Sequence, residues 1–128
     1  MSKQIIYYDL HTFFKYPFVK FKVKNKKGNK TEIQVKSFNN SIKFYLPRTP
    51  GYLEIIKKMK NEYGNMSLYE FDGYFKGEFE PIKYTRLEIH TNDINEAKIT
   101  KSANLMRKKL KQQSLAFEYN NKLIIVEE

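Results

Sequence analysis

"SIKFYLPRTPGYLEIIKKMKNEYGN", residues 41–65, predicts a strand that runs directly into a helix. In its first part, the apolar residues Ile42, Phe44 and Leu46 occupy every second position. Successive side chains of a strand point to opposite faces, so this spacing predicts a strand with one buried face.

The helix that follows has a signal at each end. Thr49 is a candidate N-cap, Pro50 suits the first helical position, and Gly64 is placed to end the helix. The expected buried stripe consists of Leu53, Ile56, Met59 or Lys60, and Tyr63. These signals predict a helix between Thr49 and Gly64.

Two more strands and a second helix are expected further along the chain. Residues 66–76 and 82–90 have strand-like patterns and are joined across "GEFEP". The second of these strands places three residues on one face: Thr85, Leu87 and Ile89. A helix is expected from "TNDINE" to about Gln112. Its buried stripe, with the spacing i, i+4, i+7 and i+11, is Ile99, Ala103, Met106 and Leu110.

The last segments, "SLAFEY" and "KLIIVEE", flank Asn120 and Asn121, which form a plausible two-residue hairpin turn. From residue 41 onward the elements therefore alternate as strand, helix, strand, strand, helix, strand, strand. This order predicts an α+β fold, with both helices on one face of an antiparallel sheet in the split βαβ, or ferredoxin-like, arrangement.

Upstream, "FVKFKVKNKKGNKTEIQVK", residues 18–36, predicts a basic β-hairpin. One face of its first arm is apolar and the other carries lysine, while Ile33 and Val35 are expected to point inward from the second arm. Together with the strand at 42–46, this hairpin would make a three-stranded meander. We expect a single domain over residues 1–128, with 1–40 as the N-terminal extension and 41–128 as a βαββαββ core.

The charge of the chain favours a polyanionic partner. Lys and Arg number 24 against 14 Asp and Glu, which gives a formal net charge of +10. Nearly all of the excess is lysine, which contacts phosphates without the bidentate base recognition typical of arginine. The composition therefore indicates nucleic-acid binding with low sequence specificity.

The candidate nucleic-acid site combines the hairpin lysines, a nearby aromatic residue and a patch on the second helix. Lysines neutralise phosphates, and aromatic faces stack on unpaired bases of single-stranded nucleic acid or RNA. Two alternatives remain open, because the hairpin lysines could be the solvated face of an edge strand and the helix lysines could complement the helix dipole. The candidate residues are Lys20, Lys22, Lys24, Lys26, Lys27, Lys30, Lys36, Tyr16, Arg107, Lys108 and Lys111.

Two short stretches resemble the signatures of the RNA-recognition motif family. "IKFYLP" at 42–47 is similar to the shorter signature, with Tyr45 or Phe44 as the stacking residue, and "GYFKGEF" at 73–79 is similar to the longer one. The resemblance implies a sheet whose central strands bind RNA. It departs from the family because the longer signature belongs on the third strand, which is "KYTRLEIHT" here.

An enzyme would have to use the acidic residues between the two helices. Carboxylates and an imidazole from this region could contribute to a Mg²⁺ site for phosphodiester hydrolysis, but cross-strand pairing, for example of Asp72 with Arg86, is the preferred explanation. The residues concerned are Glu70, Asp72, Glu78, Glu80, Glu88 and His90. The chain has no cysteine, no paired histidine motif and no glycine-rich nucleotide loop. The sequence therefore predicts a non-enzymatic protein without a metal or cofactor.

The alternative to nucleic-acid binding is a protein partner. A small basic protein rich in tyrosine also fits a phage or mobile-element product, such as an anti-CRISPR-like inhibitor that covers the surface of a host nucleic-acid enzyme. An exposed strand edge makes a homodimer possible. With no signal peptide and no apolar run that could span a bilayer, a cytoplasmic location without membrane contact is expected.

Overall fold

The structure, a computed structural model, describes residues 6–8, 18–24, 28, 30–74 and 77–128. Its internal contacts divide the chain into two compact units, Met1–Phe38 and Asn39–Glu128. We call these the N-terminal unit and the C-terminal unit and describe each by itself. That the two units form a single domain stays a prediction.

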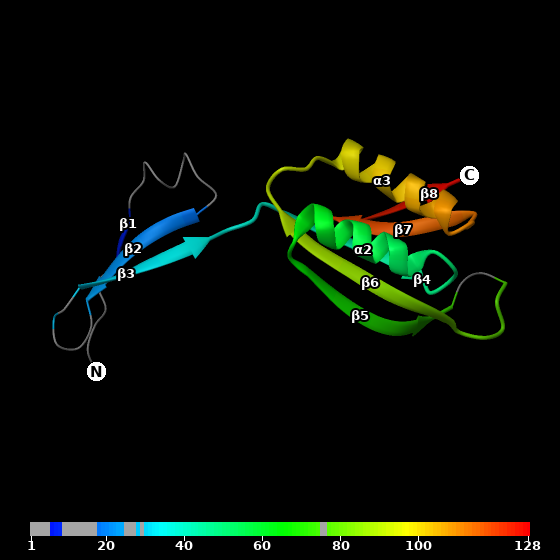
Figure 1. The fold of residues 1–128 in the computed structure, drawn as a ribbon, viewed down its shortest axis with the longest axis horizontal. Helices are drawn as coiled ribbons and strands as arrows, with labels where there is room; N and C mark the ends of the chain where they lie inside the picture. Colours follow the sequence, from blue (N-terminus) through cyan, green and yellow to red (C-terminus); the bar gives the residue numbers. More distant parts are fainter. Residues whose placement is uncertain (1–5, 9–17, 25–27, 29, 75–76) are drawn as a thin grey trace. The chain divides into compact units, whose positions relative to one another are not determined.

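The N-terminal unit contains a three-stranded antiparallel sheet (Figure 1). Its strands are β1 (Ile6–Tyr8), β2 (Phe18–Lys24) and β3 (Lys30–Lys36), in the order β1-β2-β3. The hairpin of β2 and β3 confirms the predicted ribbon. The predicted meander is wrong, because the strand at 42–46 belongs to the other sheet and, within the described residues, β3 pairs only with β2.

The expectation that Ile33 and Val35 point into a core is also wrong, because every residue of β3 is exposed. The described residues of this unit form a single sheet layer. A strand that alternates apolar and polar residues buries one face only when a second layer packs against it.

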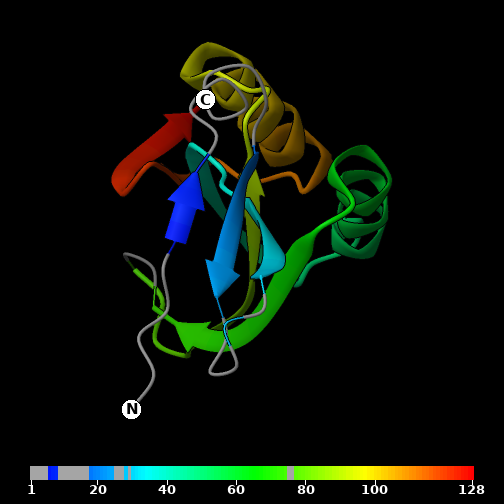
Figure 2. The ribbon, with the colours of Figure 1, turned by 90° about the vertical axis from the view of Figure 1, so that its left-hand side faces the viewer.

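The C-terminal unit is a five-stranded antiparallel sheet with two helices. In chain order its elements are β4 (Asn40–Pro47), α2 (Tyr52–Tyr63), β5 (Met66–Gly73), β6 (Ile82–Thr91), α3 (Glu96–Lys109), β7 (Ser114–Tyr119) and β8 (Lys122–Glu127). The strand order is β5-β6-β4-β7-β8, and both helices lie on one side of the sheet (Figures 1 and 2). This confirms the predicted α+β fold with a ferredoxin-like arrangement. The strand β8 extends the sheet beside β7.

The core lies between the helices and the central strands. The register places Ile42 opposite Ile89 and Phe44 opposite Leu87, and these four side chains are fully buried. Phe44 also packs on Phe117 of β7, with ring centroids 5.9 Å apart. The four residues predicted for the buried stripe of α3, Ile99, Ala103, Met106 and Leu110, are all buried.

The start of α2 differs from the prediction. Its N-cap is Gly51, with φ of 102°, so neither Thr49 nor Pro50 has the predicted role. Leu53 is 65% exposed, and Ile55 is buried instead. Because residues three or four apart share a helix face, Leu53 lies with Lys57 and Lys60 on the solvent side.

The turns at the other element ends were predicted more accurately. The N–H of Gly64 donates to Lys60 O at 2.9 Å and ends α2 as expected. Asn120 and Asn121, with φ of 50° and 68°, connect β7 to β8 and confirm the two-residue hairpin turn. Neither α2 nor α3 is long and apolar enough to cross a membrane.

Phe44→Ala should lower the free energy of unfolding of the C-terminal unit by about 3–5 kcal/mol, because the mutation leaves a cavity at the centre of the core. Leu53→Ala should change it by less than about 0.5 kcal/mol, because this side chain is on the surface. Urea unfolding followed by the helical circular dichroism signal measures both values, since α2 and α3 lie in this unit. Equal effects of the two mutations would contradict the described core.

Candidate active site on the open face of the sheet

The sheet of the C-terminal unit has a second face, which we call the open face because α2 and α3 cover the other one. Strand residues alternate between faces, so the residues between the core positions of β4 and β6 lie on the open face. The described residues on this face include Lys43, Tyr45, Tyr69, Phe71, Ile82, Tyr84, Arg86, Glu88, His90, Ala116, Glu118 and Ile125.

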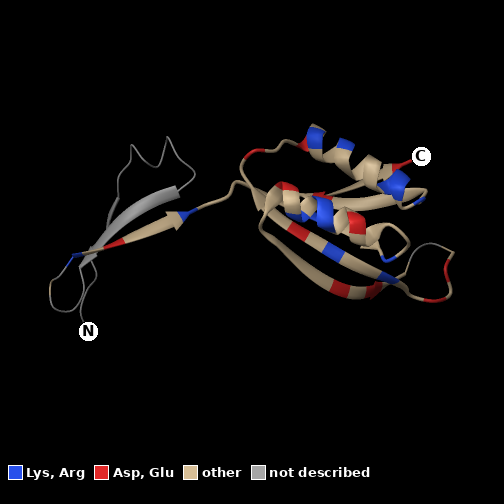
Figure 3. Ribbon diagram, viewed as in Figure 1, with Lys and Arg blue, Asp and Glu red and all other residues tan. Residues whose placement is uncertain are grey.

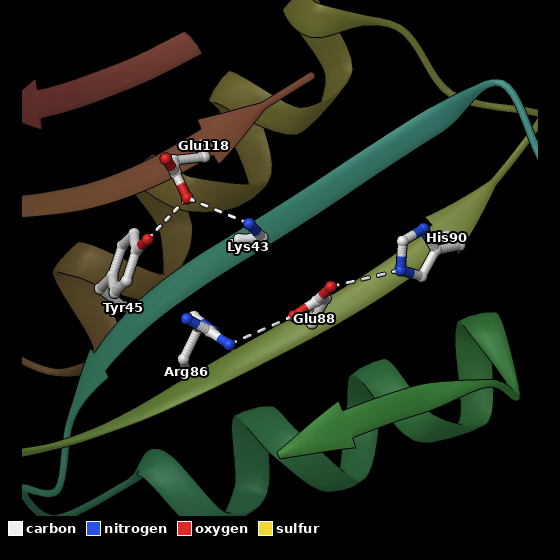
Figure 4. Close-up of polar contacts among 6 residues, drawn as sticks. All are labelled: Lys43, Tyr45, Arg86, Glu88, His90 and Glu118. Carbon is white, nitrogen blue, oxygen red and sulfur yellow. Dashed lines mark hydrogen bonds and ion pairs between the residues drawn. The ribbon is translucent and has the colours of Figure 1, made fainter. Parts of the chain in front are cut away.

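Six of these residues form what we call the polar array: Lys43, Tyr45, Arg86, Glu88, His90 and Glu118 (Figure 4). On one side of the array, the hydroxyl of Tyr45 donates a hydrogen bond to Glu118 Oε2 at 2.6 Å. Lys43 Nζ lies 3.8 Å from the same oxygen. These contacts hold the Glu118 carboxylate between β4 and β7.

On the other side of the array, Glu88 lies between two basic groups. Arg86 Nη2 is 3.6 Å from Glu88 Oε2, and His90 Nε2 is 3.3 Å from Glu88 Oε1 (Figure 4). The guanidinium of Arg86 also lies over the ring of Tyr69, 4.4 Å from its centroid. A cation over a ring face is attracted by its quadrupole, so Tyr69 helps to orient Arg86.

Beside the polar array is an aromatic pocket of about 500 Å³. Phe71 and Tyr84 are stacked with centroids 5.2 Å apart and 11° between planes, and Tyr45 meets Phe71 edge to face at 5.9 Å. The pocket lining also includes Tyr74, Glu78, Ile82, Ala116 and Ile125. Tyr45 belongs to both sites, because its ring lines the pocket and its hydroxyl contacts the array.

Gly73, at the end of β5, makes room for this ring stack. A Cβ atom at Gly73 would lie 3.0 Å from the ring of Tyr84 and 3.6 Å from that of Phe71. Such close contact would force the Tyr84 ring to shift. The glycine therefore helps to set the shape of the aromatic pocket.

Burial and the Glu118 carboxylate raise the pKa of Tyr45 to about 12. The charged form of Tyr45 would lose solvation and would face an anion, while the neutral form donates a hydrogen bond to it. The pKa of Tyr84 is raised by burial and by Glu78. At neutral pH, Tyr45 is therefore a hydrogen-bond donor and not a base.

The nucleic-acid site predicted from the sequence lies mainly in the N-terminal unit. Lys20, Lys22 and Lys24 are in β2, and Lys30 and Lys36 are exposed residues of β3. The remaining candidates of the hairpin region lie outside the described residues; they are Tyr16, Lys26 and Lys27. Binding by this set stays a prediction.

In the second predicted patch, Arg107 is not available to a partner. Its side chain is largely buried, with Nε donating to Asn104 Oδ1 at 3.0 Å and Nη1 donating to Gln112 O at 3.1 Å. Arg107 therefore stabilises the segment that follows α3 and does not contribute to the predicted basic surface patch. Lys108 and Lys111 are exposed, and Figure 3 shows Lys and Arg on both helices.

The acidic residues considered for a Mg²⁺ site do not come together. Glu70 and Asp72 are on the helix side of β5, whereas Glu88 and His90 are on the open face of β6. Within the described residues, no group of three or more His, Asp or Glu could hold a metal ion. The suggested pairing of Asp72 with Arg86 is wrong as well, because Asp72 is opposite Lys83.

The features that resemble the RNA-recognition motif occupy different places from those implied. Phe44 is fully buried, and only Tyr45 of that stretch reaches the open face as a stacking ring would. "GYFKGEF" covers the end of β5 and the following connection, not a central strand. The longer signature is therefore absent from the middle of the sheet.

Sequence reasoning missed most of the aromatic pocket. The signal was present in "IKYTRLEIHT", where Ile82, Tyr84, Arg86, Glu88 and His90 alternate with the predicted core residues. Their contacts with Phe71 and Glu118 come from neighbouring strands and depend on the pairing register. The sequence alone did not give that register.

No protein-family model matches the sequence. A search of curated proteins also finds no match. Among solved structures, the fold is similar to that of a phage SAM lyase in its apo state, with a TM-score of 0.53 and 12% identity, over 71% of this chain and 90% of that chain. At this identity, the likeness establishes a similar fold and no more.

This neighbour corrects one expectation. The absence of a catalytic motif predicted a non-enzymatic protein, and the finding that an enzyme has a similar fold contradicts it. The phage origin of the neighbour agrees with the general suggestion of a phage-type protein. Inhibition of a host enzyme, a homodimer and a cytoplasmic location stay predictions.

Stability should fall as the pH rises from 10 to about 12, partly through Tyr45. The unfolded chain releases this phenolic proton near pH 10, but the folded protein keeps it up to about 12, so the contribution is complete below 10 and is lost across this interval. Tyr45→Phe should therefore weaken the alkaline loss, as measured by urea midpoints through this range. Tyr74→Phe, at an exposed tyrosine, is the control. An unchanged alkaline loss in Tyr45→Phe would contradict the described contact.

Proposed function

We propose that the chain is an enzyme that binds S-adenosylmethionine in the aromatic pocket and breaks a carbon–sulfur bond of this sulfonium compound. The observation that carries the proposal is the set of three rings, Tyr45, Phe71 and Tyr84, around a pocket next to the Glu118 carboxylate. The similar fold of a phage SAM lyase supports this choice of ligand.

The size and the lining of the pocket suit the adenosyl group. Ligand sites for small molecules usually measure about 300–1,000 Å³ and are mostly apolar with a few polar groups. The pocket here is about 500 Å³. A purine ring can extend the stack of Phe71 and Tyr84, because aromatic faces of any kind stack on one another.

The charge of the site suits the sulfonium group. Ring faces attract cations, and the Glu118 carboxylate, which accepts a hydrogen bond from Tyr45, adds a negative charge near the pocket. When the bond between the sulfur and Cγ of the amino-acid arm breaks, the sulfur keeps the electron pair and leaves as a neutral thioether. The carboxylate of the same arm forms the new bond to Cγ and closes a lactone, so the step balances without a protein nucleophile and without a proton for the leaving group.

Incubation with S-adenosylmethionine should produce the thioether nucleoside 5′-methylthioadenosine, detected by liquid chromatography. Tyr84→Leu should weaken ligand binding roughly tenfold, because stacking on an aromatic ring contributes on the order of 1–3 kcal/mol per base. Phe79→Leu is the matched control, since Phe79 is 98% exposed and is not part of the pocket lining. Calorimetry that finds no binding, together with no nucleoside product, would reject the proposal.

We also propose that the N-terminal unit binds nucleic acid, as its composition predicts. The β2–β3 register pairs Lys20 with Gln34, Lys22 with Glu32, and Lys24 with Lys30. Of these three partners, one is acidic, one neutral and one basic, so cross-strand neighbours do not match the lysines one for one. A positive excess on a ribbon supports unspecific phosphate contact.

Changing Lys20, Lys22 and Lys24 together to Glu should abolish binding to single-stranded DNA or RNA and flatten its dependence on salt. Lys57, Lys58 and Lys60 of α2, changed together to Glu, give a control with the same change in net charge. Gel-shift assays over a salt series compare the two variants. Equal losses in both would show that only overall charge matters.

A further inference from the structure

Two ion pairs of the polar array are long, as is Arg48–Glu70 outside the array at 3.5 Å, whereas two exposed ion pairs elsewhere in the C-terminal unit are short. Nitrogen and oxygen are 3.8 Å apart in Lys43–Glu118 and 3.6 Å apart in Arg86–Glu88. They are 2.7 Å apart in Lys109–Glu54 and 2.8 Å apart in Lys122–Glu96, which lie outside the array. Charge-assisted hydrogen bonds are about 2.7–2.9 Å long, so the charges of the array attract one another without closing such bonds.

Four of the array side chains are partly shielded from water, whereas His90 is about half exposed. The side chains of Lys43, Arg86, Glu88 and Glu118 are 25%, 32%, 17% and 24% exposed. Arg86 Nε is buried and has no hydrogen-bond partner among the described residues. Buried donors in folded proteins nearly always have an acceptor, so Arg86 Nε, like Arg48 Nε elsewhere in this unit, is a donor that lacks its usual partner.

The signs of the charges alternate across the strands. Lys43 on β4 is opposite Glu88 on β6 and opposite Glu118 on β7, while Arg86 precedes Glu88 along β6. Two cations and two carboxylates thus share a small area of the sheet. The matching ligand group is a zwitterion, because it can offer an anion to the cations and a cation to the carboxylates at the same time.

We propose that the polar array binds the α-amino-acid group of the substrate, with its carboxylate on Arg86 and Lys43 and its ammonium on Glu88 and Glu118. The inference rests on the proposed function, because S-adenosylmethionine carries this group on the sulfur atom. Arg86 is two residues from Tyr84 along β6, about 7 Å, so the array begins next to the ring stack. The array therefore determines which adenosyl compounds are accepted.

Three ligands distinguish the contribution of the polar array to binding from that of the aromatic pocket. S-adenosylmethionine has the whole amino-acid group, decarboxylated S-adenosylmethionine lacks only the carboxylate, and 5′-methylthioadenosine lacks both the entire arm and the positive charge on sulfur. The affinity of the wild-type protein for each, measured by titration calorimetry, should be highest for S-adenosylmethionine. It should fall about tenfold when the carboxylate is missing, as expected for a charge-assisted hydrogen bond.

Arg86→Met should weaken binding of S-adenosylmethionine about tenfold, while leaving the affinities for decarboxylated S-adenosylmethionine and 5′-methylthioadenosine unchanged. Lys43→Met should give the same pattern, and Arg86→Lys, which keeps the charge, should retain part of the affinity. The matched control is Arg48→Met, because Arg48 also has a buried Nε without a hydrogen-bond partner but pairs with Glu70 away from the array. Circular dichroism checks that each variant is folded.

Each outcome distinguishes this inference from the proposed function. If wild-type protein binds S-adenosylmethionine and 5′-methylthioadenosine equally well, or if Arg86→Met weakens both equally, the inference is wrong and the aromatic pocket still stands. If wild-type protein binds none of the three ligands, the proposed function is wrong and the inference falls with it. Selective loss of the carboxylate-bearing ligand in both Arg86→Met and Lys43→Met supports the inference.

Discussion

The structure of the C-terminal unit depends on the strict alternation of side chains along β4, the central strand of its sheet. Ile42, Phe44 and Leu46 face the helices and are fully buried, and this apolar face joins β6 and β7 to α2 and α3 in one core. Because side chains alternate along a pleated strand, the direction of the residues between them is fixed. Lys43 and Tyr45 must lie on the opposite face.

The same constraint explains why the candidate site is an extended surface built on rigid elements. Tyr45, Tyr84 and Phe71 come from three adjacent strands, and the backbone pairing that buries Phe44 also brings these rings together. Sites held by strands keep their geometry better than sites held by loops. The strand pairing that forms the core therefore also positions the three rings of the site.

Sequence patterns predicted the elements that alternate or repeat strongly. The stripe of α3, the core face of β6 and the Asn120–Asn121 turn are where they were expected. The errors concern features that depend on distant partners. The N-cap of α2 is Gly51, a left-handed residue, whereas Thr49 and Pro50 predicted an earlier start. The alternation of β3 predicted a buried face, but among the described residues no second layer lies against it.

The candidate site was harder to predict for the same reason. Arg107 belongs to a run of basic residues that predicted a surface patch. In the structure its guanidinium donates to the side-chain oxygen of Asn104 in α3 and to the backbone carbonyl of Gln112, after the helix. The polar residues of β6 were visible in the sequence; Glu88 and His90 were considered for a metal site, and cross-strand pairing was the preferred explanation. Their partners Tyr45, Phe71 and Glu118 are far away in the sequence, and only the sheet order brings them near.

The Asn120–Asn121 turn has a consequence for how this surface could change. The side chain of Asn120 accepts a hydrogen bond from Ser41 N and donates one to Asn40, which fixes the tip of the hairpin to the start of β4. Insertion or deletion of a single residue there would invert β8, turning Ile125 away from the pocket and bringing Ile124 and Val126 to the open side. The length of this turn thus determines which residues of β8 line the pocket. A single insertion or deletion in the turn would change the pocket lining without a substitution at any lining residue.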